Sequence, residues 1–228
     1  LAELRDDLIP AAFQGTGAQV DVGGDVAGNV DWQDSMKSHL PLVFGFVLTL
    51  SFLLLLFTFR SVVIPITSIA LNMLSVGAAY GLLVLVFQDG FAQGLLGAHS
   101  SGITSWLPLF LFVVLFGLSM DYHVFILSRI KELVDRGMPT EKAIERGIGS
   151  TAGTVTSAAI VMVAVFSIFA TLSFIEFKQM GVGLAAAILI DATLIRGVML
   201  PATMKLLGER NWYLPSWLEW LPKRRLAD

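Results

Sequence analysis

The sequence has no cysteine among its 228 residues, and only 14% of its residues are charged. Without cysteine there is no disulfide, no thiol nucleophile and no thiolate-bound zinc or iron-sulfur cluster. The three histidines, His39, His99 and His123, lack the spacing of a metal site, so no metal or other cofactor is predicted. A net charge of −3 leaves no basic stripe for phosphates, which argues against a nucleic-acid partner.

Apolar residues are abundant instead. They make up 55% of the chain, and the mean hydropathy is +0.76. Soluble proteins reach about 45 to 50% even when glycine is counted. The composition therefore predicts an integral membrane protein. The chain begins with leucine and shows no signal peptide, so we expect it to be part of a longer polypeptide.

Five apolar runs are long enough to cross the ~30 Å hydrocarbon core, which takes about 20 residues of helix. The predicted fold is therefore an all-α integral membrane bundle over residues 39–208. Its five transmembrane helices are expected at residues 40–59, 62–87, 106–128, 150–174 and 180–207. Only Arg60 and Ser61 separate the first two spans, which predicts a tight hairpin.

The polar segments around these runs have different compositions. Residues 1–38 are rich in turn residues, and we interpret them as the end of an extracytoplasmic domain plus a connector, with one strand at residues 18–22. Residues 88–105 form a Gly/Ser-rich loop. The connector at residues 129–149 predicts a short amphipathic helix capped by Thr140. Residues 175–179 form a brief link, and the aromatic, basic tail at 209–228 is typical of a segment lying against headgroups.

Positive charge in the short loops predicts the orientation. One side collects eleven cations: Arg60, Arg129, Lys131, Arg136, Lys142, Arg146, Lys205, Arg210, Lys223, Arg224 and Arg225. The other side has Arg5, Lys37 and Lys178. The eleven-cation side is predicted to be cytoplasmic, with the C-terminus on it. An odd number of spans that starts outside implies at least one earlier span.

Asp121 is the most unusual residue of the third predicted span. It precedes Arg129 by eight residues, which places it roughly 12 Å inside the basic end. A carboxylate at such a depth costs at least ~2.5 kcal/mol and often serves a proton, an ion or a partner charge. Burial disfavours the charged form, which suits a group that loads and releases protons, and Tyr122 beside it can donate a hydrogen bond. The alternative is a carboxyl group that only stiffens the bundle.

Asp191 is the second intramembrane acid. It precedes Arg196 by five positions, which is too far round an α-helix for an ideal ion pair, so a salt bridge between the two is possible but strained. One interpretation gives Asp191 a part in transport. In the other, Arg196 extends toward the cytoplasmic headgroups and Asp191 bonds a neighbouring hydroxyl group.

Small and hydroxyl residues line the fourth predicted span. Gly149, Gly153 and Ser157 repeat every four residues, a pattern typical of close helix packing. Thr154 and Ser157 lie on nearly the same face and are candidates to hold water or share a proton with Asp121. Asn72, in the second span, is predicted mainly to join helices, with a supporting part in the relay as the alternative.

Four motifs in order carry a resemblance to a known family. They are NMLSVGAAYGLLVLVFQ at residues 72–88, GLSMDYHVFILSRIKE at 117–132, GSTAGTVTSAA at 149–159 and LIDATLIRGVMLPATMKLLGERNWYLP at 189–215. The chain resembles the MMPL (mycobacterial membrane protein large) transporters of the RND superfamily over essentially residues 40–215. The match is to the C-terminal half of such a transporter, its last five of twelve spans.

The resemblance implies a proton-driven exporter of a lipid or other hydrophobic or amphiphilic molecule in the bacterial cell membrane. It implies a porter domain before residue 39 and an N-terminal half as the missing partner. In the family an Asp-Tyr pair on this helix faces an equivalent pair of the first half, so Asp121 and Tyr122 inherit the proton relay, with the proton as coupling ion. His123 stands where many relatives have an acidic residue. The cargo is not readable, and a homo-oligomer is left open.

Other classes remain as alternatives. An intramembrane aspartyl protease also needs two buried acids, but its usual Tyr-Asp and Gly-x-Gly-Asp patterns are absent around Asp121 and Asp191. A sensor related to sterol-sensing domains shares the five-helix plan without needing the relay. A purely structural membrane subunit does not account for the buried acid.

Overall fold

The computed structural model describes residues 1–91 and 102–221, and every regular element within these ranges is helical. Five helices are long and apolar enough to cross a membrane: Asp25–Phe59, Val63–Gln88, Leu107–Asp135, Thr140–Phe169 and Ile175–Trp212. The predicted all-α membrane fold with five spans is confirmed. Most of the predicted loop at 88–105 and the end of the predicted tail lie outside the described residues.

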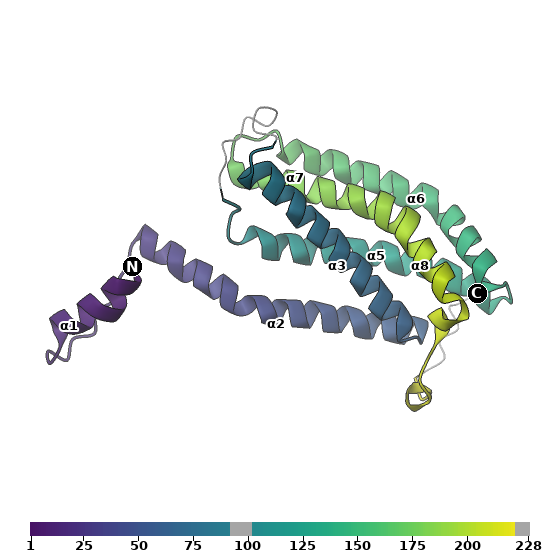
Figure 1. Ribbon diagram of the computed structural model, residues 1–228, viewed down its shortest axis with the longest axis horizontal. Coiled ribbons are helices and arrows are strands. Elements are labelled where there is room, and N and C mark those ends of the chain that lie inside the picture. The colour runs from purple at the N-terminus through teal and green to yellow at the C-terminus, as the bar shows by residue number, and fades with distance from the viewer. Residues whose placement is uncertain (92–101, 222–228) are drawn as a thin grey trace. The chain divides into compact units, whose positions relative to one another are not determined.

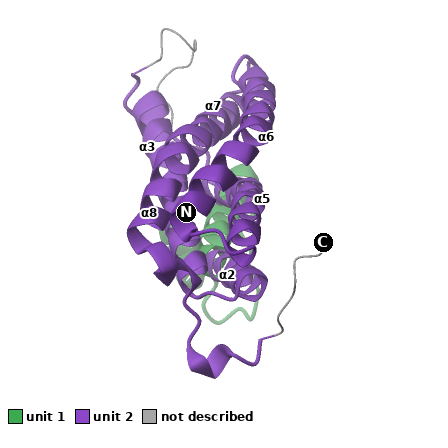
Figure 2. Cartoon of the chain, turned by 90° about the vertical axis from the view of Figure 1, so that its right-hand side faces the viewer, with its two compact units in different colours: residues 1–43 green, residues 44–228 purple. Residues whose placement is uncertain are grey.

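The chain divides into two compact units, Leu1–Val43 and Phe44–Asp228 (Figure 2). The first unit holds η1 (Leu4–Leu8), α1 (Ile9–Phe13) and the start of α2 (Asp25–Phe59). Arg5 pairs with Asp31 of α2 and also donates to the carbonyl of Val22 at 3.2 Å. The strand predicted at residues 18–22 is wrong: these residues have no regular structure, because no strand among the described residues supplies the hydrogen bonds that it requires.

The second unit is the helical bundle (Figure 1). After the remainder of α2 come α3 (Val63–Leu83) with the π-helical η2 (Val84–Gln88), α5 (Leu107–Asp135) and α6 (Thr140–Phe169). The last span is one continuous helix built from α7 (Ile175–Ile190), the π-helical η3 (Asp191–Met199) and α8 (Leu200–Leu207). The short helix η4 (Gly208–Trp212) ends this span, and η5 (Ser216–Leu218) follows it.

The hairpin between the first two spans forms as predicted. Arg60 has φ of +48°, which reverses the chain between α2 and α3. The Ser61 hydroxyl donates to the carbonyl of Asn211 at 2.6 Å and accepts from the amide of Val63 at 3.1 Å. Leu218 packs on Leu56 beside this turn. The C-terminal segment therefore fastens the hairpin.

Helix bounds differ from the predicted spans in the second half of the chain. The short helix predicted before residue 150 does not end there. It continues into the fourth span, and both are part of α6. Thr140 does not cap it; Pro139 precedes the helix and the Thr140 hydroxyl accepts from the Trp212 indole at 3.2 Å. The fourth helix ends at Phe169, and the predicted link at 175–179 belongs to α7. The membrane boundaries themselves stay predictions.

Close packing between neighbouring helices depends on two glycines. A Cβ on Gly181 would lie 2.5 Å from the amide nitrogen of Ala170, where α6 turns into α7. A Cβ on Gly147 would lie 2.5 Å from Cγ1 of Ile130, where α5 meets α6. Real Cβ atoms do not approach other atoms so closely, so both positions need glycine.

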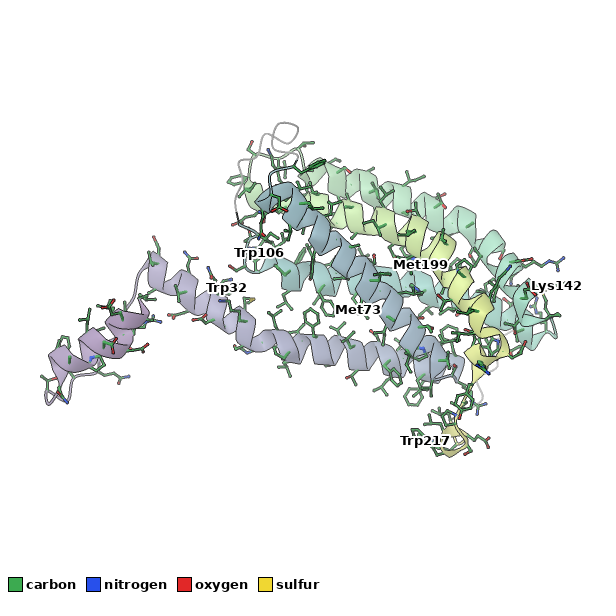
Figure 3. All side chains as sticks on the ribbon, in the orientation of Figure 1. Trp32, Met73, Trp106, Lys142, Met199 and Trp217 are labelled. Carbon is green, nitrogen blue, oxygen red and sulfur yellow. The ribbon has the colours of Figure 1, made fainter. Side chains whose placement is uncertain are left out.

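The two ends of the bundle have different character. Trp106 and Lys142 lie at opposite ends, and Trp217 lies toward the Lys142 end (Figure 3). At that end Lys205 pairs with Glu145 at 2.6 Å, and the Lys131 ammonium lies 4.8 Å from the centre of the Trp212 ring. The basic connectors predicted to share one side therefore meet at one end, while Lys223, Arg224 and Arg225 lie outside the described residues.

Candidate functional site

Asp191 and Arg196 form a buried ion pair in the last span. In an α-helix, residues five apart point about 140° away from each other. Here they lie in η3, whose wide turns bond residues five apart and so bring the two side chains onto one side. Arg196 is 4% exposed and Asp191 6% exposed, and their side chains are in contact. The alternative in which Arg196 extends toward the headgroups is wrong, because the π-helical turn gives it a nearer partner.

Ser119 connects this pair to two other helices. The Arg196 guanidinium donates to the Ser119 carbonyl at 2.9 Å and to its hydroxyl at 3.1 Å. The same hydroxyl donates to the Asn72 side-chain oxygen at 2.6 Å. Asn72 therefore joins helices, as predicted from its place in the second span. We call Asn72, Ser119, Asp191 and Arg196 the inner polar cluster.

Tyr122 and His123 lie against the inner polar cluster. The centre of the Tyr122 ring is 4.5 Å from the guanidinium carbon of Arg196, a cation–π contact. The Tyr122 hydroxyl lies 3.7 Å from the sulfur of Met162. His123 is fully buried, with Nδ1 3.4 Å from the Ser119 carbonyl. Tyr122, the aromatic member of the Asp-Tyr pair, therefore packs against the interior of the bundle.

Asp121 points the other way. It is exposed on α5, and no described residue makes an ion pair or hydrogen bond with its side chain. Thr154 and Ser157, predicted to line a crevice with it, are also exposed. Gly149 and Gly153 are exposed too, and a Cβ on either would meet nothing within 4 Å. The predicted small-residue ridge therefore does not pack within this chain.

We call this second set the outer face. The name refers only to exposed positions on two helices: Gly117 and Asp121 of α5 and Gly149, Gly153, Thr154 and Ser157 of α6. Within the described residues, no group of three metal-ligating side chains comes together.

Sequence reasoning missed Ser119, which links Asn72 to Arg196 in the inner polar cluster. A single serine in an apolar span has no motif of its own. The available signal was its spacing: Ser119 lies four residues before His123, so both share one face of α5. Arg196 was recognised as unusual, but the turn that pairs it with Asp191 was not.

Comparison with known proteins places this sequence in a family. The chain matches the MMPL family over residues 3–227. It is 42% identical over 205 residues to the "Mycolic acid-containing lipids exporter MmpL11" of Mycolicibacterium smegmatis, which covers 90% of this chain and 22% of that protein. It is 43% identical over 201 residues to the "Heme uptake protein MmpL11" of Mycobacterium tuberculosis, covering 88% of this chain and 21% of that protein.

A third relative is the "Trehalose monomycolate exporter MmpL3" of Mycobacterium tuberculosis, 35% identical over 224 residues, which are 98% of this chain and 23% of that protein. The chain thus spans about a fifth of the length of these relatives. Because the family match covers almost every residue, the resemblance seen in the sequence is confirmed. The chain belongs to the MMPL family.

Proposed function

We propose that this chain is the C-terminal membrane bundle of a proton-driven exporter in the bacterial cell membrane. The cargo class is a lipid or another hydrophobic or amphiphilic molecule. Two of the three relatives described above carry names of lipid exporters, and the third is named for heme, which is also amphiphilic. The specific cargo is not part of the proposal.

The observation that carries this proposal is the position of Asp121. An acid in the middle of an apolar helix is costly in hydrocarbon, and on this chain it has no partner among the described residues. A face with such an acid requires a covering surface that can accept its charge or its proton. The chain is about a fifth of the length of its relatives, so we assign this covering surface to an N-terminal half of the same transporter.

In the proposed cycle, Asp121 takes a proton from the outer side through a polar path lined by Thr154 and Ser157. Neutralisation removes its interaction with acids of the N-terminal half, so the two halves shift relative to each other. The shift is passed to the porter domain that moves the cargo. Tyr122 is the inner member of the relay. Its ring contacts Arg196 inside the bundle, while the adjacent Asp121 is exposed.

In this scheme the inner polar cluster has a structural part: it holds the helix that carries Asp121 in place. Asp191 and Asn72 are tied through Arg196 and Ser119, so they fix the helix that carries Asp121 rather than meet the cargo. We place the end that carries Arg60, Lys142 and Lys205 on the cytoplasmic side, and the C-terminus with it, because positive residues in short loops favour that side.

The test is export by the full transporter with Asp121→Asn, which keeps the size of the side chain but removes its charge change. We expect export to be lost while the amount of transporter in the membrane is unchanged. The matched control is Asp135→Asn at the polar end of the same helix, where the carboxylate only pairs with Lys131. Normal export by the Asp121→Asn transporter would refute the proposal.

The geometry does not favour the protease alternative. An aspartyl protease needs two carboxyl groups on one water molecule, whereas Asp191 is held by Arg196 inside the bundle and Asp121 is exposed. A sensor without transport would be favoured by cargo binding that is independent of pH and accompanied by no proton flux in vesicles.

A further inference from the structure

A small cavity lies within the bundle beside the inner polar cluster. Its volume is about 20 Å³. Most of its lining is apolar and includes Met162, and the polar side chains that reach it are Asn72, Ser75, Ser119, Tyr122, Asp191 and Arg196. All of these residues belong to the second unit, so the cavity is a feature of one compact body.

Three buried polar atoms that belong to residues lining this cavity have no hydrogen-bond partner among the described residues. They are the amide nitrogen of the Asn72 side chain, Oδ1 of Asp191 and Nε of Arg196. Their residues are at least nine-tenths buried. Leaving one buried polar atom unsatisfied costs about 1–3 kcal/mol, so three such atoms around one cavity need an explanation.

We propose that this cavity is a binding site for one ordered water molecule. A water needs roughly 10–15 Å³ of room and two to four polar partners, and both conditions are met here. The chemistry is complementary, because Asn72 and Arg196 offer N–H donors and Asp191 offers an acceptor oxygen. The water accepts from the two donors and donates to the carboxylate.

The bound water closes a ring of hydrogen bonds. Asn72 already accepts from Ser119, which accepts from Arg196, which binds Asp191, and the water joins Asp191 back to Asn72. The existence of this site does not depend on export being proton-driven. Its use as a proton-carrying contact next to Tyr122 does rest on the proposed function.

Hydroxyl-radical footprinting of the full transporter tests the site, since radicals formed from a bound water label side chains beside it. Met162 and Tyr122 line the cavity and report on it, while Met138 at the polar end of the bundle reports on bulk water. We expect rapid labelling of Met162 and Tyr122 in the unchanged transporter. Asn72→Leu fills the cavity with apolar atoms and should reduce the labelling of both half-buried residues, with Met138 unchanged.

Two further variants make the result decisive. Asn29→Leu is the matched control, the same substitution at an exposed position of the first unit, and should leave all labelling unchanged. Asn72→Ala enlarges the cavity and leaves Asp191 and Arg196 in place, so labelling should persist; if Asn72→Leu does not fold, loss of labelling in a folded Asn72→Ala would overturn the proposal. Labelling of Met162 and Tyr122 that is absent in the unchanged transporter, or unaffected by a folded Asn72→Leu, would overturn the proposal.

Discussion

The two intramembrane acids of this chain have opposite surroundings. Asp191 is buried and held by Arg196 inside the bundle, whereas Asp121 is exposed and has no partner among the described residues. The members of the inner polar cluster bond one another within this chain. An acid whose partner lies on its own helix stabilises the structure, while an acid without one is available to something outside it.

The largest expected effect comes from breaking the inner ion pair. Arg196→Leu leaves the Asp191 carboxylate buried without a cation and should lower the free energy of unfolding by about 3–5 kcal/mol. Adding Asp191→Leu removes the stranded charge and should recover most of the loss. Equilibrium unfolding of the full transporter in mixed micelles measures both changes.

The control for that experiment is Lys205→Leu, which removes the ion pair between Lys205 and Glu145 at the surface. Exposed pairs contribute little, so no measurable change is expected. If Arg196→Leu were as mild as this control, the inner pair would not be the structural element that its burial suggests.

A smaller loss of stability is expected when alanine replaces a glycine that packs between helices, and none when it replaces a glycine of the outer face. Gly147→Ala places a Cβ 2.5 Å from Cγ1 of Ile130 and should cost about 1–3 kcal/mol, because α5 and α6 must move apart. Gly149→Ala adds the same methyl group to the outer face, where nothing lies within 4 Å. The thermal midpoint of unfolding should fall for the first variant only; equal falls would show that the outer face packs within this chain.

Apolar run length was sufficient to predict the five helices, because the hydrocarbon core fixes how long an apolar segment must be. The hairpin at Arg60 could be predicted because only two residues separate the first two apolar runs. Helix ends were harder to predict. The polar residues among 175–179 suggested a link, but these residues form the first turns of α7. Polar residues can be helical wherever the backbone hydrogen bonds of the helix form.

Residue patterns identified Asp121, Asp191 and Asn72 as unusual, but not their neighbours. The Asp191–Arg196 pair depends on a change of helical hydrogen bonding that the 3.6-residue period does not predict. The glycine ridge showed that close approach is possible, but not which face a neighbouring helix occupies. Gly147, outside the ridge, makes the contact instead.

The most direct test of this account is chemical modification of the two acids in the full transporter. A hydrophobic carbodiimide reacts with carboxyl groups that are protonated in apolar surroundings, and mass spectrometry locates the product. We predict that Asp121 is modified, with loss of export, while Asp191 stays protected by its ion pair with Arg196. Modification of Asp191 alone, or an Asp121 that never reacts in a transporter that still exports its cargo, would contradict the account.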